Sequence, residues 1–102
     1  MPTIAQLEKL LELDPDDPFV HYGLGQECAK VGDHDQAIAC YTKTIELDPT
    51  YCYAYYFKGV SLNDLGRRDE AMKVIKDGIS AAQESNDGHA TSELSELLQS
   101  IE

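Results

Sequence analysis

The sequence is poor in basic residues, and this shortage excludes whole classes of partner. Only 8 Lys and Arg stand against 19 Asp and Glu among 102 residues, which gives a formal charge of -11. A field of that sign repels phosphate backbones and anionic headgroups, so we expect neither nucleic acid nor a membrane as a partner. The sequence also lacks an apolar run near the roughly 18 residues that span a bilayer, and it lacks a secretion signal. We therefore expect a cytoplasmic protein.

Cysteine is scarce as well, and the three that occur are spaced twelve residues apart. Their odd number argues against a disulfide framework, and the spacing is not that of a zinc site. Because free cysteine is among the most buried residue types, we expect inert thiols in the core. The residues concerned are Cys28, Cys40 and Cys52.

Patterns that carry catalysis or bind cofactors are also missing. The segment Gly23-Leu24-Gly25 lacks the third glycine of a dinucleotide fingerprint, and no strand is predicted before it. The acidic turn over residues 14–17 lacks the central glycine and closing glutamate of a calcium loop. His21, His34 and His89 share no ligand spacing. We therefore expect no enzyme, no cofactor and no metal.

What the sequence does contain is an internal repeat of 34 residues. The segment Glu12–Pro15 recurs as Glu46–Pro49. Other identical pairs at the same offset are Tyr22 and Tyr56, Gly25 and Gly59, Gly32 and Gly66, and Ala37 and Ala71. Self-similarity at a fixed period indicates a stack of equal structural units.

One period has the boundaries of a helical hairpin. Asp17-Pro18 predicts a helix start, because the carboxylate can accept from free amides and proline is tolerated in the first turn. Gly32 predicts the left-handed end of that helix, near Val31, and Asp33 predicts the start of the next. Asp48-Pro49 ends the second helix, since the residue before proline avoids the helical region.

This pattern resembles the tetratricopeptide repeat over roughly residues 3 to 85. The second copy departs from the first at three positions: it has Lys58 where the first has Leu24, Gly78 where the first has Thr44, and Gln83 where the closing proline is expected. Without that proline, the second unit should end less sharply. The signature in the first copy is Leu24-Gly25, Cys28, Gly32, Ala37, Tyr41 and Pro49, and in the second Gly59, Leu62, Gly66, Ala71 and Ile75.

The resemblance implies an all-α fold, with about six antiparallel helices in a short right-handed superhelix. We interpret residues 1–102 as a single repeat domain. Residues 3–15 are a half repeat that opens on the capping box Thr3-x-x-Gln6, residues 18–51 and 52–85 are full repeats, and residues 87–101 are a cap helix. Such ends are typical of a complete array or of one cut at a repeat boundary. The apolar stripe of the cap helix is Ala90, Leu94, Leu97, Leu98 and Ile101.

Aromatic residues are concentrated at the start of one helix, with five of the eight in residues 51–57. Such a run must wrap around a helix, so some rings point away from the core. Tyr55 takes the place of His21 and should pack between helices. In the resembling family the first helix of each unit lines a concave groove. Carried over, the groove residues are Phe19, Tyr22, Gln26, Tyr53, Tyr56, Phe57 and Val60, with Lys30 and Asn63 as further members.

The resemblance and the aromatic groove together predict a module that binds a peptide segment of a partner protein. One alternative is that these rings pack against the neighbouring unit or the cap helix. Another is a self-associating structural element that uses the aromatic surface or the cap stripe, so a monomer or weak homodimer is expected. Chaperone-tail binders of the family carry cations at groove positions that hold Tyr22, Gln26, Phe57 and Val60 here, which disfavours that ligand. The spread acidity also suits high salt, a hypothesis that a melting temperature unchanged in molar KCl would contradict.

Overall fold

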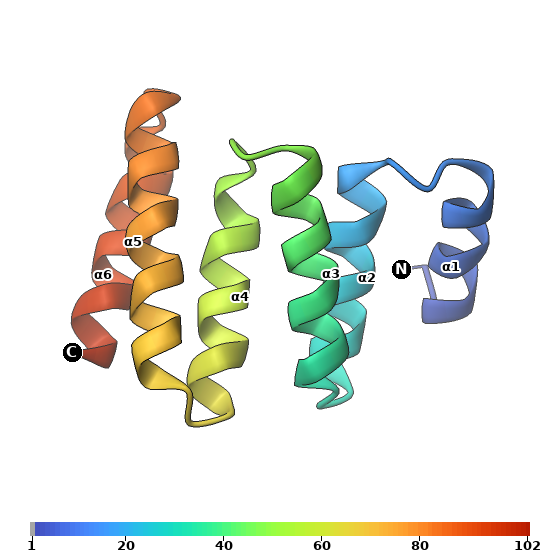
Figure 1. Cartoon of the computed structure of the whole chain (residues 1–102), viewed down its shortest axis with the longest axis horizontal. Helices are drawn as coiled ribbons and strands as arrows, with labels where there is room; N and C mark the ends of the chain where they lie inside the picture. Colours follow the sequence, from blue (N-terminus) through green and yellow to red (C-terminus); the bar gives the residue numbers. More distant parts are fainter. Residues whose placement is uncertain (1) are drawn as a thin grey trace.

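The computed structural model describes residues 2–102 and contains, within them, six α-helices and no strand. The all-α fold predicted from the repeat is therefore confirmed (Figure 1). The helices are α1 (Ile4–Leu13), α2 (Pro18–Lys30), α3 (His34–Leu47), α4 (Cys52–Asp64), α5 (Arg68–Glu84) and α6 (Gly88–Ile101).

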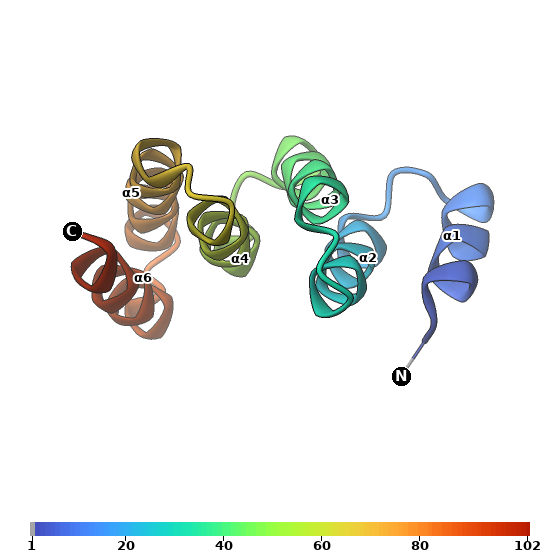
Figure 2. The same ribbon diagram turned by 90° about the horizontal axis from the view of Figure 1, so that it is seen from below.

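The helices stack in chain order as two hairpins flanked by single helices. Helices α2 and α3 form one hairpin, α4 and α5 the other, and α6 packs against both α4 and α5. Seen along the helices, α2, α4 and α6 form one row while α3 and α5 form the other (Figure 2). In the described part of the chain α1 contacts no helix except α2, so it is the least covered element of the stack.

Local capping explains where the helices begin and end. The Thr3 hydroxyl accepts from the Gln6 amide at 3.1 Å while the Gln6 side chain accepts from the Thr3 amide at 2.9 Å, as a capping box requires. Gly32 and Gly66 end α2 and α4 with φ of +80° and +79°, a left-handed backbone that glycine adopts without steric cost. These termini match the sequence predictions.

The cap of α2 allows the contribution of one side chain, that of Asp17, to the free energy of unfolding to be tested. Asp17 accepts from the amides of Phe19 at 3.0 Å and Val20 at 3.4 Å. We expect Asp17→Ala to lower the free energy of unfolding by about 1 kcal/mol, because two amides lose their acceptor. The control Asp16→Ala removes an exposed carboxylate that caps no helix. Equal chemical denaturation midpoints for the two variants would contradict this role of Asp17.

Small residues let the two helices of each hairpin approach closely. A Cβ added to Gly25 would lie 2.7 Å from the Tyr41 ring, and one added to Gly59 would lie 2.6 Å from Ile75. Both partners are fully buried, so there is no room into which they could turn. Glycine is therefore required at this position of both repeats by packing rather than by backbone conformation.

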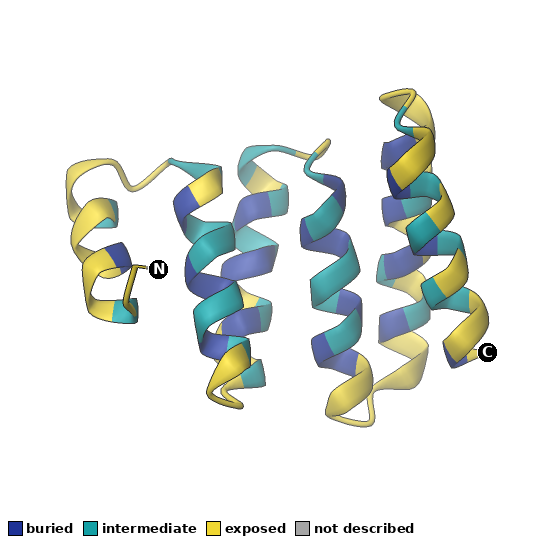
Figure 3. Ribbon diagram, turned by 180° about the vertical axis from the view of Figure 1, so that it is seen from behind, coloured by how far each residue is buried: buried dark blue, intermediate teal, exposed yellow. Residues whose placement is uncertain are grey.

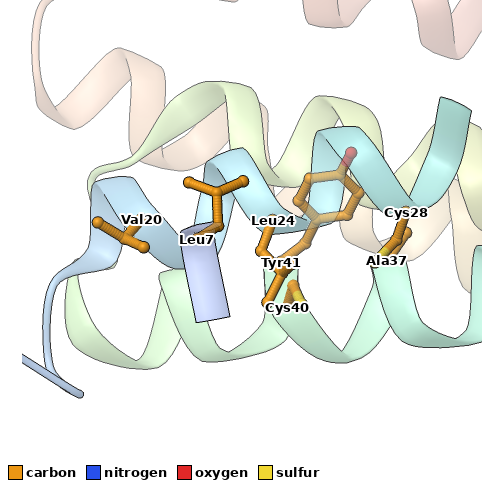
Figure 4. Close-up of a cluster of buried hydrophobic side chains, with 7 residues drawn as sticks. All are labelled: Leu7, Val20, Leu24, Cys28, Ala37, Cys40 and Tyr41. Carbon is orange, nitrogen blue, oxygen red and sulfur yellow. The ribbon is translucent and has the colours of Figure 1, made fainter. Parts of the chain in front are cut away.

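The apolar core is divided into two clusters. The first joins α1, α2 and α3, and its members are Leu7, Val20, Leu24, Cys28, Ala37, Cys40 and Tyr41 (Figure 4). The second joins α4, α5 and α6, and its members are Cys52, Ile75, Ala82, Ala90, Leu94 and Ile101. Buried positions therefore face the helix contacts along the stack, whereas α1 is exposed over most of its length (Figure 3).

The second repeat ends later than the first, as the missing proline predicts. Helix α5 has 17 residues against 14 in α3, and Gln83 lies inside it. The cap stripe faces the stack, with Ala90, Leu94 and Ile101 buried. Leu97 and Leu98 of the same stripe are half-buried against the second cluster.

Candidate functional site

Four aromatic rings from α2 and α4 form a continuous row, which we call the aromatic strip. Its members are Tyr22, Phe57, Tyr56 and Tyr53. Neighbouring ring centroids lie 6.3, 4.9 and 6.3 Å apart in that order, within the range of favourable aromatic contacts. All four side chains are half-buried, so each ring packs on one side and remains accessible on the other.

Tyr22 takes part in packing more than the groove interpretation assumed. Its ring centroid lies 4.9 Å from that of Tyr51 and 6.0 Å from that of Tyr41. Burial, with smaller contributions from Tyr51 and Tyr53, raises the pKa of Tyr22 to about 12. Tyr22 therefore packs mainly within residues 18–51, its ring contact with the second repeat is the one with Phe57, and only part of its ring faces solvent.

The other groove residues lie on either side of the strip. Phe19 is 68% exposed at the start of α2. Gln26 accepts a hydrogen bond from the Tyr41 hydroxyl, which fixes its side chain. Gln26, Phe57 and Val60 line one hollow of about 310 Å³, which Lys30 also borders. Asn63 is exposed near the end of α4.

Helix α6, the cap helix, reaches the far end of the strip, as the packing alternative allowed. The Tyr53 hydroxyl donates to Glu93 at 3.3 Å, a contact across 40 positions of the chain. Tyr55, by contrast, is buried as expected, and its hydroxyl donates to the carbonyl of Pro49 at 2.7 Å. His21 lies 2.8 Å from the carbonyl of Pro15, so the same linkage recurs one repeat earlier.

The sequence did not predict a polar group at the 310 Å³ hollow, formed by His34, Ser61 and Asp64. His34 Nδ1 lies 3.2 Å from the Ser61 hydroxyl, and His34 Nε2 lies 3.9 Å from the Asp64 carboxylate. These residue types also form catalytic triads, but Ser61 is 2% exposed and lies inside α4. Backbone amides there are engaged in the helix and cannot form an oxyanion hole. The group therefore links the start of α3 to α4.

The three thiols are buried, and we expect them to be unreactive in the folded protein. Burial raises the pKa of Cys28 and Cys52, and raises that of Cys40 to about 11. Because the thiolate is the nucleophile, labelling by a disulfide reagent at pH 8 should be slow until denaturant is added. Rapid labelling of the native protein would contradict this expectation and would place a thiol at the surface.

Residues 2–102 contain no group of three His, Cys, Asp or Glu side chains able to hold a metal ion. Over the same residues, no helix has the length and apolar character that crossing a membrane demands.

This fold is that of a helical repeat protein. Antiparallel hairpins stack with a period of 34 residues, and the first helix of each hairpin lies in one row. Models of one family, the tetratricopeptide repeat, match residues 18–51 and 53–85. The chain belongs to this family. A tetratricopeptide repeat domain protein from Salinibacter ruber is 35% identical, with 87% of this chain and 90% of that chain covered and a TM-score of 0.81. Comparison with curated proteins gave no match.

Two more distant structures share the fold. The TPR2B domain of yeast Sti1, in complex with pHsp70, is 21% identical, with 96% of this chain and 78% of that chain covered and a TM-score of 0.90. PcrH, in complex with the chaperone binding region of PopD, is 18% identical, with coverages of 96% and 74% and a TM-score of 0.89. At these identities the likeness establishes the arrangement of helices alone.

Proposed function

We propose that this protein is an interaction module that binds a peptide segment of a partner protein along the face of α2 and α4. The observation that carries the proposal is the aromatic strip, in which four half-buried rings run across two repeats. Rigid aromatic side chains lose little conformational entropy on binding and are enriched at interface hot spots. We place the ligand on Phe19, Tyr22, Gln26, Tyr53, Tyr56, Phe57 and Val60.

Two relatives in fold support this class of function. The yeast Sti1 domain and PcrH were each solved in complex with part of another protein. The chemistry of the surface restricts the ligand further. No cation belongs to the strip, and the whole chain carries -11, so an acidic tail is disfavoured and an apolar or basic segment is favoured.

Self-association through the aromatic strip is the alternative use of the same surface. The partial exposure of the rings would serve either role, and light scattering separates the two. A stable dimer that Tyr56→Ala dissociates would favour self-association. A monomer leaves the strip free for a different protein.

The proposal is tested by affinity capture from a cell extract of the source organism. The bait is compared with Tyr56→Ala, which shortens a ring in the strip, and with Val31→Ala, which shortens a 70% exposed side chain at the end of α2. We expect the partner to be retained by the wild type and Val31→Ala and lost by Tyr56→Ala. Equal retention by all three proteins would refute the strip as the binding surface.

A further inference from the structure

A second apolar hollow lies between α1 and α2, away from α4. It has a volume of about 540 Å³, and Leu7 and Leu10 of α1 face Phe19, Val20 and Gly23 of α2 across it. An adjoining hollow of about 580 Å³ continues along α1 over Leu10 and Leu13. We call these two hollows together the α1 cleft. Its exposed apolar side chains are Leu10, Leu13 and Phe19, at 47%, 84% and 68%.

The internal repeat indicates what kind of element fits this cleft. Leu10 corresponds to Thr44 in α3, which is fully buried, and to Gly78 in α5, which is buried against Tyr55 of α4. Thr3 is exposed, whereas its counterparts Ala37 and Ala71 are fully buried.

In both full repeats this face of the second helix is covered by the first helix of the same unit. Helix α1 presents the same face without such a cover. Two internal copies of the contact therefore show that an α-helix fits there.

We propose that the α1 cleft is the seat of an amphipathic helix from a partner protein, with basic residues at its amino end, lying parallel to α2. This helix packs on α1 as the first helix of each full unit packs on the second. The seat shares Phe19, Tyr22 and Gln26 with the proposed peptide groove, but its other wall is α1 and no residue of α4 lines it. The two sites therefore overlap on α2, and the α4 residues of the groove distinguish them.

Charge at one end of the cleft favours one direction and one sign for the occupant. The end of α1 and the following turn carry Glu12, Asp14 and Asp16, all exposed, and outnumber Lys9 beside them, whereas at the opposite end Lys30 is paired with Glu27 at 2.9 Å. A helix parallel to α2 places its positive amino terminus beside the exposed carboxylates. Basic residues in its first turns would strengthen the same attraction.

The shape of α2 leaves space for this helix. Phe57 of α4 reaches back to Tyr22 in the preceding repeat, with ring centroids 6.3 Å apart. The residue at the corresponding place in α2 is Gly23. A Cβ there would touch only Leu7, at 3.7 Å, so a side chain of the bound helix can occupy the volume that a ring fills in the next repeat.

A second copy of this chain suits the seat poorly. Helix α6 occupies a first-helix place at the other end of the stack, but Glu93 stands where α2 and α4 have Gly25 and Gly59. A glutamate at that position prevents the close approach that the glycines allow. Two chains of charge -11 also repel each other.

The test uses two synthetic peptides and the whole protein labelled for NMR. Both peptides contain residues 17–31 of this chain, the segment that covers α3 in the first repeat, with Cys28 replaced by Ala. One is preceded by three lysines and the other by three glutamates. Backbone shifts are followed in the wild type, in Leu10→Ser/Leu13→Ser and in Tyr56→Ala, at low and high salt. Circular dichroism checks that each variant is folded. We expect Leu10→Ser/Leu13→Ser to fold, because both leucines are exposed.

We expect the lysine peptide to shift the α1 and Phe19 signals and to bind at least about tenfold more weakly to Leu10→Ser/Leu13→Ser. The glutamate peptide should bind about tenfold more weakly at low salt, and high salt should remove most of that difference. Tyr56→Ala should bind as the wild type does, so failure of the groove and failure of the cleft are distinguishable.

Three results would overturn the proposal. The first is an absence of shifts in α1 at millimolar lysine peptide, or equal binding by Leu10→Ser/Leu13→Ser. The second is equal affinity for the two peptides at low salt, which would refute a basic occupant. The third is a wild-type dimer that Leu10→Ser/Leu13→Ser converts to a monomer, which would assign the cleft to a second copy.

Discussion

Replacing Gly78 by alanine is expected to lower the free energy of unfolding by about 2–3 kcal/mol, although alanine is ordinarily the better helix former. The added Cβ would lie 2.6 Å from the Cβ of Tyr55 and 3.2 Å from Leu94. A Cβ cannot swing aside, so α4 and α5 must separate. The strain acts where α4, α5 and α6 meet, and it should appear as a fall of roughly 10 °C in the melting temperature.

The matched control is Gly23→Ala in α2. Its Cβ meets only Leu7 at 3.7 Å, which is an ordinary contact. Because the helix gains a better former without a clash, we expect stability to rise by about 0.5–1 kcal/mol. Thermal melts of the two variants should therefore move in opposite directions. A Gly78→Ala protein that melts at or above the wild-type temperature would contradict the close packing at this junction.

Truncating both Tyr22 and Tyr56 to alanine is expected to weaken partner binding by about 2–4 kcal/mol, typical of two hot-spot residues. The structure adds a second effect that the sequence did not predict. Because Tyr22 packs against Tyr41 and Tyr51, its loss should also lower the free energy of unfolding by about 2 kcal/mol. Calorimetric titration with the captured partner measures the first effect, and chemical denaturation measures the second.

Two single variants separate binding from stability. Tyr56→Ala alone should carry a large part of the binding loss, since Tyr56 belongs to the strip and makes no contact with Tyr41 or Tyr51 among its ring pairs. Tyr22→Phe keeps the ring and should be close to the wild type in both measurements. Undiminished affinity in the double variant, with the fold intact, would remove both tyrosines from the binding surface.

The sequence predicted the helices well because each boundary is set by local chemistry. Asp17, Gly32 and the Thr3–Gln6 pair act on neighbours within a few residues, and the structure confirms all three. The internal repeat predicted how the helices pair, because a 34-residue offset indicates which helices form hairpins. Buried thiols and the cap stripe followed from ordinary burial preferences and helical spacing.

Features that depend on side chains from distant elements could not be predicted in the same way. The packing of Tyr22 on Tyr51 and the contact of Tyr53 with Glu93 both join residues far apart along the chain. Helix phase gives a direction for a side chain but not the neighbour that meets it. The pairing of His34 with Ser61 was missed for the same reason, since their separation of 27 residues is not a repeat period.

The division of the core into two clusters has a mechanical consequence. The clusters share no buried residue, and the rings of Tyr22 and Phe57 join the two repeats on the face of α2 and α4. The packing at this junction sets the angle between the two hairpins, and so the curvature of the stack. A molecule that inserts between Tyr22 and Phe57 would change this angle. A molecule that holds the two rings together would reduce the fluctuation of the angle.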